Sequence, residues 1–181
     1  YEYIDLDEEG TSAKKLEEKK VDIMHISPSH HFPTGMVMPI SKRYELLGWV
    51  TREKERYIIE DDYDSELRLA GKPIPSLQSI DVSGKVIYIN TFAKTLCSTV
   101  RISYMVLPEA LAEKYYRELS FYSCTVSNFE QYTLAAFMNA GAFEKHINRL
   151  RNYYQHKRDL ILSTFLREPL GKYITISEED S

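Results

Sequence analysis

An acidic stretch that follows a short apolar run is the first feature of this sequence that could do chemistry. The letters EDDYDSE run from Glu60 to Glu66, directly after three apolar residues. Clustered carboxylates at the end of a buried strand could bind a divalent metal, act as an acid–base pair, or pair with a cationic ring nitrogen. A solvated acidic turn explains the cluster equally well when it is considered alone.

A lysine follows the next apolar run along the chain. Lys94 ends the sequence Thr91-Phe92-Ala93-Lys94, and Arg101 follows seven residues later. A single lysine is most often an ordinary surface residue. A lysine that attacks a carbonyl needs a low-dielectric setting or a cationic neighbour, because either one lowers the pKa of its amine.

The two motifs together supply every group that a pyridoxal phosphate (PLP) site needs. Such a site requires a lysine for covalent attachment, an acid for the pyridine nitrogen, a donor for the ring oxygen and cations for the phosphate. Lys94 could form the covalent link, Asp61 could meet the ring nitrogen, and Tyr63 could reach the ring oxygen. Arg101 and the Thr91 hydroxyl could hold the phosphate.

Short apolar runs that alternate with helical patterns predict a parallel α/β fold around these residues. The strand candidates are residues 21–27, 56–60, 85–90 and 102–107. A helical pattern from about residue 41 to residue 54 has apolar positions at Ile40, Tyr44, Leu47 and Val50. Strand, helix and strand in this order favour a mostly parallel sheet, with the chemistry at the strand ends.

Three amphipathic helices are predicted after Pro108, which suits a helix start. Ser127 and Glu130 form a capping-box signature ahead of the second helix, and Gly141 suits its end. The third helix should extend to about Leu166. We therefore expect a three-layer α/β/α arrangement, with the helices between residues 108 and 166 packed outside the sheet.

The bulk properties describe a chain with room for one ordinary core. It has 181 residues, of which 43% are hydrophobic, and a formal net charge of −4. This charge gives no long-range attraction to nucleic acid. The two cysteines, Cys97 and Cys124, have no metal-like spacing, so we assign no metal site and expect a reducing, cytoplasmic setting. No apolar run approaches the roughly 20 residues that cross a bilayer.

Four stretches resemble, in order and spacing, the PLP domain of MocR-like, GntR-class bacterial transcription regulators, which belong to the fold-type-I aminotransferase superfamily. They are HISPSHHFPTGMVMP, IIEDDYDSELRLAGKPIPSLQSID, VIYINTFAKTLCSTVRISYMVLP and GAFEKHINRLRNYYQHKRD. The resemblance covers the chain from about Tyr1 to its end. It implies that Asp61 meets the pyridine nitrogen, Tyr63 the ring oxygen and Arg101 the phosphate, and that Lys94 binds the cofactor covalently.

One departure from the superfamily pattern favours the regulator branch, and a second one affects the phosphate site. Aminotransferases usually have an asparagine before their Pro-Thr-Gly sequence, whereas this chain has Phe32. Position 93 is alanine where serine is common, so one possible hydroxyl for the phosphate is lost. The hydroxyl of Thr91 is then required more strongly for binding the phosphate. The resemblance implies an effector-sensing domain whose effector is an amine or an amino acid. A free-standing aminotransferase and a degenerate scaffold without PLP stay open as alternatives, as does any retained transaminase activity.

The resemblance also implies how the complete protein is organised. Residues 1–181 would form part of one large aminotransferase-like domain, with about residues 167–181 entering a small C-terminal domain. DNA would be bound only through a winged helix-turn-helix outside this chain, and the complete protein would be a homodimer that does not bind membranes. PLP would bind to the complete protein, and weakly or not at all to this segment alone.

Overall fold

The computed structural model describes residues 1–7, 9–69, 74–167 and 171–174, which form two compact units. Unit 1 comprises Tyr1–Ser65 and Pro73–Thr125, and unit 2 comprises Glu66–Lys72 and Val126–Ser181. All five residues predicted for the cofactor site lie in unit 1.

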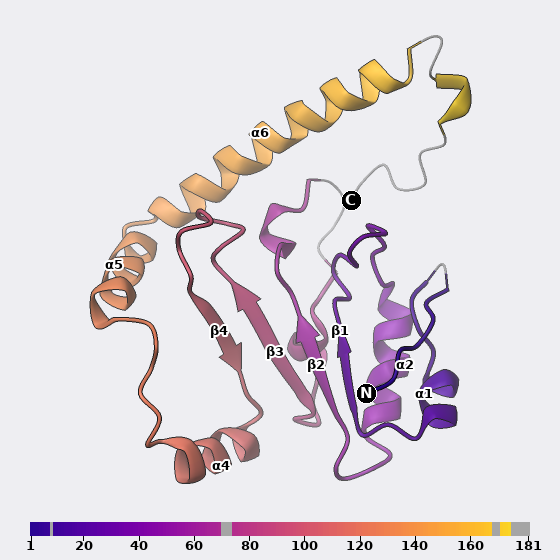
Figure 1. The fold of residues 1–181 in the computed structure, drawn as a ribbon, viewed down its shortest axis with the longest axis vertical. Helices are drawn as coiled ribbons and strands as arrows, with labels where there is room; N and C mark the ends of the chain where they lie inside the picture. The colour runs from indigo at the N-terminus through magenta and orange to yellow at the C-terminus, as the bar shows by residue number, and fades with distance from the viewer. Residues whose placement is uncertain (8, 70–73, 168–170, 175–181) are drawn as a thin grey trace. The chain divides into compact units, whose positions relative to one another are not determined.

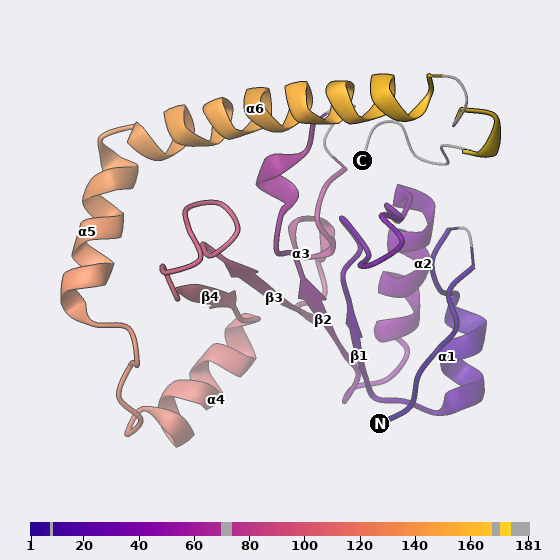
Figure 2. The same ribbon diagram turned by 45° about the horizontal axis from the view of Figure 1, so that its top comes forward.

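Unit 1 is built on a four-stranded sheet with the order β1-β2-β3-β4, whose strands lie side by side in Figures 1 and 2. The strands are β1 (Ile23–Ile26), β2 (Tyr57–Asp61), β3 (Val86–Thr91) and β4 (Ser103–Val106). The first three are parallel, and β4 is antiparallel to β3. Each strand lies within its predicted stretch or ends one residue beyond it. The prediction of an α/β fold with a mostly parallel sheet is confirmed.

Among its described residues, unit 1 also contains four α-helices, of which two were not predicted. Helix α2 (Ile40–Val50) begins where it was predicted but ends four residues before its predicted end, and α4 (Glu109–Leu119) begins directly after Pro108 as predicted. Helices α1 (Ala13–Lys19) and α3 (Leu77–Ile80) are short, and the side chains of Ser12 and Ser76 cap their N-termini. A 3₁₀ turn, η1 (Ser65–Leu67), follows β2 at the point where the chain passes from unit 1 to unit 2.

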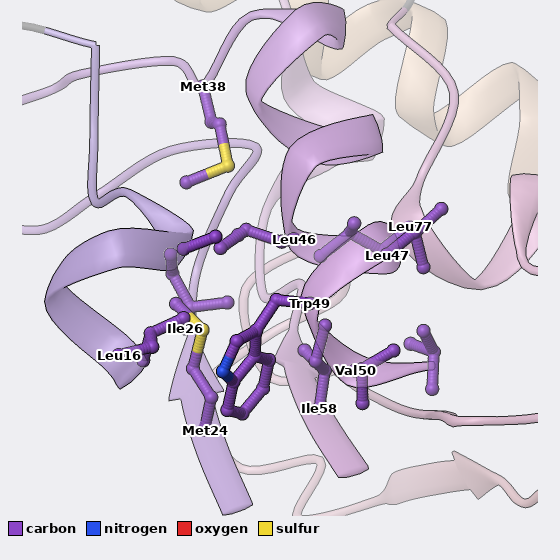
Figure 3. Packing of buried hydrophobic residues seen from close by; sticks show 12 residues of the cluster. Leu16, Met24, Ile26, Met38, Leu46, Leu47, Trp49, Val50, Ile58 and Leu77 are labelled. Atoms are coloured by element: carbon purple, nitrogen blue, oxygen red, sulfur yellow. The ribbon is translucent and has the colours of Figure 1, made fainter. Parts of the chain in front are cut away.

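The core of unit 1 lies between one face of the sheet and the helices α1, α2 and α3. Side chains alternate between the two faces of a strand, so Met24 and Ile26 share a face with Ile58 of β2 and Val86 of β3. Figure 3 shows how this face packs against the helices through Leu16, Leu46, Leu47, Trp49, Val50 and Leu77. Each fully buried side chain of this size contributes about 1.5–3 kcal/mol to folding. The opposite face of the sheet carries His25, Asp61 and Thr91.

Unit 2 consists of α5 (Asn128–Asn139), α6 (Ala142–Phe165) and the 3₁₀ turn η2 (Gly171–Tyr173). The predicted capping box is confirmed, since Ser127 Oγ accepts from Glu130 N and Glu130 Oε2 accepts from Ser127 N. Gly141, with φ of 66°, separates the two helices in a left-handed conformation that favours glycine.

Among the described residues, no helix is both long enough and apolar enough to pass through a bilayer. The predicted entry into a second domain at about residues 167–181 falls mostly outside the described residues, because only 167 and 171–174 of that stretch are described.

Candidate cofactor-binding site

The acidic stretch after β2 divides between the two faces of the sheet. Glu60 and Asp62 are 0% and 4% exposed and point toward the helix-covered face, whereas Asp61 and Tyr63 are only partly buried. Strand alternation produces this division. The interpretation of the whole cluster as a solvated turn is therefore wrong for Glu60 and Asp62.

The carboxylate of Asp61 lies beside a histidine of the neighbouring strand. His25 Nε2 of β1 lies 3.3 Å from Asp61 Oδ2. Residue 25 pairs with Ile59 in the parallel register, so its side chain lies on the same face as that of Asp61. A role for His25 could not be predicted from the sequence, because it is one polar residue among the apolar residues of β1.

The phenol of Tyr63 is a neutral hydrogen-bond donor. Its hydroxyl donates to the main-chain oxygen of His30 at 2.7 Å. Burial raises the pKa of Tyr63, and the nearby charges of Asp64, Asp61 and Asp62 raise it further. The hydroxyl therefore keeps its proton at neutral pH and can donate to an anionic oxygen.

The loop between β3 and β4 carries the other predicted residues. Phe92 N donates to Ile102 O at 2.9 Å, which closes the loop at its base. Thr91 lies at this base, where its hydroxyl accepts from Ala93 N at 3.2 Å. Lys94 and Arg101 lie within the loop with exposed side chains.

The register of the sheet brings these groups to one edge. Asp61 pairs with Ile89, and Thr91 follows two residues later on the same face of β3. Tyr63 continues from β2, and the loop that holds Lys94 and Arg101 continues from β3. Among the described residues, no hydrogen bond or ion pair joins the side chains of these five residues to one another.

The donor set of this edge fits PLP better than a metal ion. A carboxylate, a phenol, an amine, a hydroxyl and a guanidinium match the ring nitrogen, ring oxygen, aldehyde and phosphate of PLP. Hard divalent cations instead require several oxygen ligands around one point. The described residues contain no group of three or more His, Cys, Asp and Glu that could hold a metal ion.

A buried network supports the end of β2 from the opposite face. Asp62 Oδ2 accepts from Tyr88 Oη at 2.8 Å and from Ser65 Oγ at 2.7 Å, and Asn90 Nδ2 donates to Tyr88 Oη at 2.9 Å. Burial is the largest cause of a strongly raised pKa of Tyr88, so this phenol stays protonated. The network ties β2 to β3 directly behind Asp61 and Thr91. It could not be predicted from the sequence, because Asp62 and Tyr88 are 26 residues apart.

The loop between β1 and α2 contains two neighbouring histidines, His30 and His31. His30 Nδ1 lies 2.8 Å from Asp64 Oδ2, whereas His31 Nδ1 lies 3.1 Å from Thr34 Oγ1 within its own turn. Phe32, which replaces the asparagine of aminotransferases, is 80% exposed. His30 therefore joins its loop to the end of β2, and His31 does not.

Comparison with known sequences gives regulators as relatives. YdeL of Bacillus subtilis, an uncharacterized HTH-type transcriptional regulator, is 44% identical over 178 residues, which cover 98% of this chain and 38% of YdeL. The probable rhizopine catabolism regulatory protein MocR of Rhizobium meliloti is 36% identical, over 88% of this chain and 32% of that protein. The chain thus spans less than two fifths of the length of these two relatives. No protein-family model matches it.

Comparison with solved structures gives aminotransferases. The kynurenine aminotransferase of Pyrococcus horikoshii, solved in complex with PMP, matches with a TM-score of 0.77 and 32% identity, over 88% of this chain and 42% of that structure. The described α/β unit is therefore a partial aminotransferase fold. Within that class, the sequence groups the chain with HTH-type regulators of the MocR type, as the resemblance implied.

Proposed function

We propose that this chain is the effector-sensing, PLP-binding domain of a MocR-type transcription regulator. The proposal rests mainly on one observation, which is that Asp61, Tyr63, Thr91, Lys94 and Arg101 gather at the carboxyl-terminal edge of β2 and β3. Ligands of parallel α/β sheets bind at this edge. The sequence relatives add the regulatory context, because both are regulatory proteins.

Each side chain has one task in this proposal. Asp61 keeps a proton on the ring nitrogen, since a carboxylate stabilises a cation beside it. Tyr63 donates to the ring oxygen, and Arg101 and Thr91 bind the phosphate. Lys94 holds the cofactor covalently. When bound, PLP supplies an aldehyde that primary amines attack and a ring that withdraws electrons.

The effector class follows from the role of Lys94. An amine or amino-acid effector competes with the Lys94 amine for the same aldehyde, so effector binding releases the lysine side chain. That release changes the charge and contacts of the loop between β3 and β4. A local change of this kind can shift a conformational equilibrium of the complete protein, a homodimer in this proposal, and through it the DNA affinity of a helix-turn-helix domain outside this chain.

The experiment uses the complete gene product and the DNA upstream of its own gene. We expect PLP-loaded wild type to change its DNA affinity when a panel of amines and amino acids is added. Lys94→Ala should lose this response, and the control Lys114→Ala, which changes an exposed lysine on α4, should keep it. An unchanged DNA affinity across the panel, or an equal response in Lys94→Ala, would contradict the proposal.

A working aminotransferase is the competing function, favoured by the 32% identity to the kynurenine aminotransferase. The same preparations separate the two functions. Multiple turnovers of an amino acid with a keto acid, without an effect on DNA binding, would establish the enzyme instead.

A further inference from the structure

Three contacts fasten the loop between β1 and α2 to the end of β2. Tyr63 Oη donates to His30 O at 2.7 Å, and His30 Nδ1 lies 2.8 Å from Asp64 Oδ2. The rings of His30 and Tyr63 are stacked, with centroids 6.4 Å apart and an interplanar angle of 23°. The backbone and the side chain of His30 are thus held by two adjacent residues of one segment.

The contact between His30 and Asp64 is a directed hydrogen bond. An ionised carboxylate only accepts, so Nδ1 of His30 carries the hydrogen. The side chains of His30 and Asp64 are 39% and 20% exposed, which places the pair partly out of water. Hydrogen bonds to charged groups are stronger than neutral ones, and partial burial reduces their screening.

The hydroxyl of Tyr63 has only one hydrogen to donate. In the described structure that hydrogen goes to His30 O. If Tyr63 donates to a cofactor oxygen instead, the His30 carbonyl loses this bond, and the loop loses one of the contacts that join it to the segment after β2. The bond between His30 and Asp64 does not depend on the hydroxyl, so it remains when the hydroxyl turns.

We propose that His30 and Asp64 are positioning residues, which hold the Tyr63 ring and the loop in place while the Tyr63 hydroxyl serves the cofactor. The inference rests on the proposed function, because it assigns the hydroxyl to the ring oxygen of PLP. Neither His30 nor Asp64 touches the cofactor in this scheme. Both act through Tyr63.

The test follows the visible absorbance of the lysine-bound cofactor across pH in the complete protein. A phenol that donates to the ring oxygen withdraws electron density from the attached Lys94 nitrogen and lowers its pKa. Tyr63→Phe should therefore raise the pH at which the absorbance changes. Its shift is the largest that the loss of this hydrogen bond can cause. His30→Ala and Asp64→Asn should also raise the pH of this transition, by about half to one pH unit.

Two variants separate positioning from a general loss of structure. His30→Asn keeps an N–H group near the place of Nδ1, so its transition should stay close to that of wild type. His31→Ala changes a histidine of the same loop that bonds only within its turn, and it should leave the transition unchanged. Asp64→Asn is nearly isosteric with the wild-type side chain, so it tests the positioning role if His30→Ala fails to fold.

A second readout uses the PLP-free protein labelled with fluorotyrosine. Tyr63→Phe identifies the fluorine resonance of residue 63. We expect that resonance to move in His30→Ala and Asp64→Asn and to stay in place in His31→Ala.

The outcomes distinguish the inference from the proposed function. If Tyr63→Phe moves the absorbance transition but His30→Ala and Asp64→Asn do not, the positioning role is wrong and the cofactor role of Tyr63 stands. If wild type shows no cofactor band, or Tyr63→Phe leaves the transition unmoved, the assigned role of Tyr63 fails and the inference fails with it.

Discussion

Arg43 Nη1 lies 3.8 Å from Glu60 Oε1, with side chains that are 1% and 0% exposed. The guanidinium also donates to Pro28 O and Pro75 O, each at 2.9 Å, and Glu60 accepts from Leu77 N at 2.8 Å. Burial raises the pKa of Glu60, against the opposing effects of two backbone N–H groups and Arg43. The pair therefore joins the start of the loop between β1 and α2 to the start of α3, behind the candidate site.

Replacing Glu60 tests the importance of this buried pair. Glu60→Gln leaves a buried guanidinium without its counter-charge and turns one acceptor into a donor that faces an N–H group. We expect the free energy of unfolding to fall by about 2–4 kcal/mol. Urea denaturation followed by circular dichroism measures it, with the exposed Glu55→Gln as the control, expected to stay within about 0.5 kcal/mol. Equal midpoints for the two variants would refute a structural role for the pair.

Asp81 gives the protein a pH-dependent stability. Its Oδ1 accepts from Ser83 N and Ser83 Oγ, and its Oδ2 accepts from Lys85 N and Val86 N, at the entry to β3. Burial alone would raise the pKa of Asp81, but these hydrogen bonds hold it below its ordinary value. The ionised form therefore stabilises the fold above the ordinary pKa, and this stability is lost as the pH falls through the lowered pKa.

Asp81→Asn should remove part of this acid dependence. At neutral pH we expect the variant to be less stable by about 1–2 kcal/mol, because its amide can supply only one accepting oxygen. Between about pH 5 and pH 2 the difference from wild type should shrink, since wild type loses its advantage on protonation. Urea midpoints of both proteins, measured at several pH values, show how this stability difference depends on pH. A constant difference across this range would show that Asp81 does not titrate as described.

The strands and the capping box were predictable because local patterns determine them. Short apolar runs fixed β1 to β4 to within about two residues, and Ser127 with Glu130 marked the start of α5. The inward face of α2 was predicted less well. Leu47 and Val50 are buried, but Ile40 and Tyr44 are 38% and 58% exposed, and the buried Arg43 occupies the inward position next to Tyr44.

The partners of the site residues could not be predicted from local patterns. His25 contacts Asp61 from another strand, and Asp64 contacts His30 across a separation of 34 residues. Such pairs depend on the register of the sheet and on the path of a loop. The sequence identified which residues could do chemistry, and the three-dimensional arrangement is needed to find what holds them in place.

The charge of Asp61 should control cofactor affinity without being required for covalent attachment. Asp61→Asn keeps the size of the side chain and removes the charge that stabilises a protonated ring nitrogen. We expect PLP to bind the complete protein about ten- to a hundredfold more weakly, and to exchange more slowly with amines. Equilibrium titration of the PLP-free protein measures this, with the exposed Asp22→Asn as a charge-matched control. Equal affinities for wild type and Asp61→Asn would remove Asp61 from the site.

Borohydride reduction of the complete protein with PLP tests the central assignment most directly. Reduction fixes the cofactor to the lysine that holds it, and mass spectrometry of the peptides then locates the pyridoxyl group. The account predicts that the group is on Lys94 in wild type and in the control Lys114→Ala, and that Lys94→Ala has neither the visible band nor a labelled lysine. A Lys94→Ala protein that retained a borohydride-reducible lysine–PLP linkage would contradict the assignment and the proposed function with it.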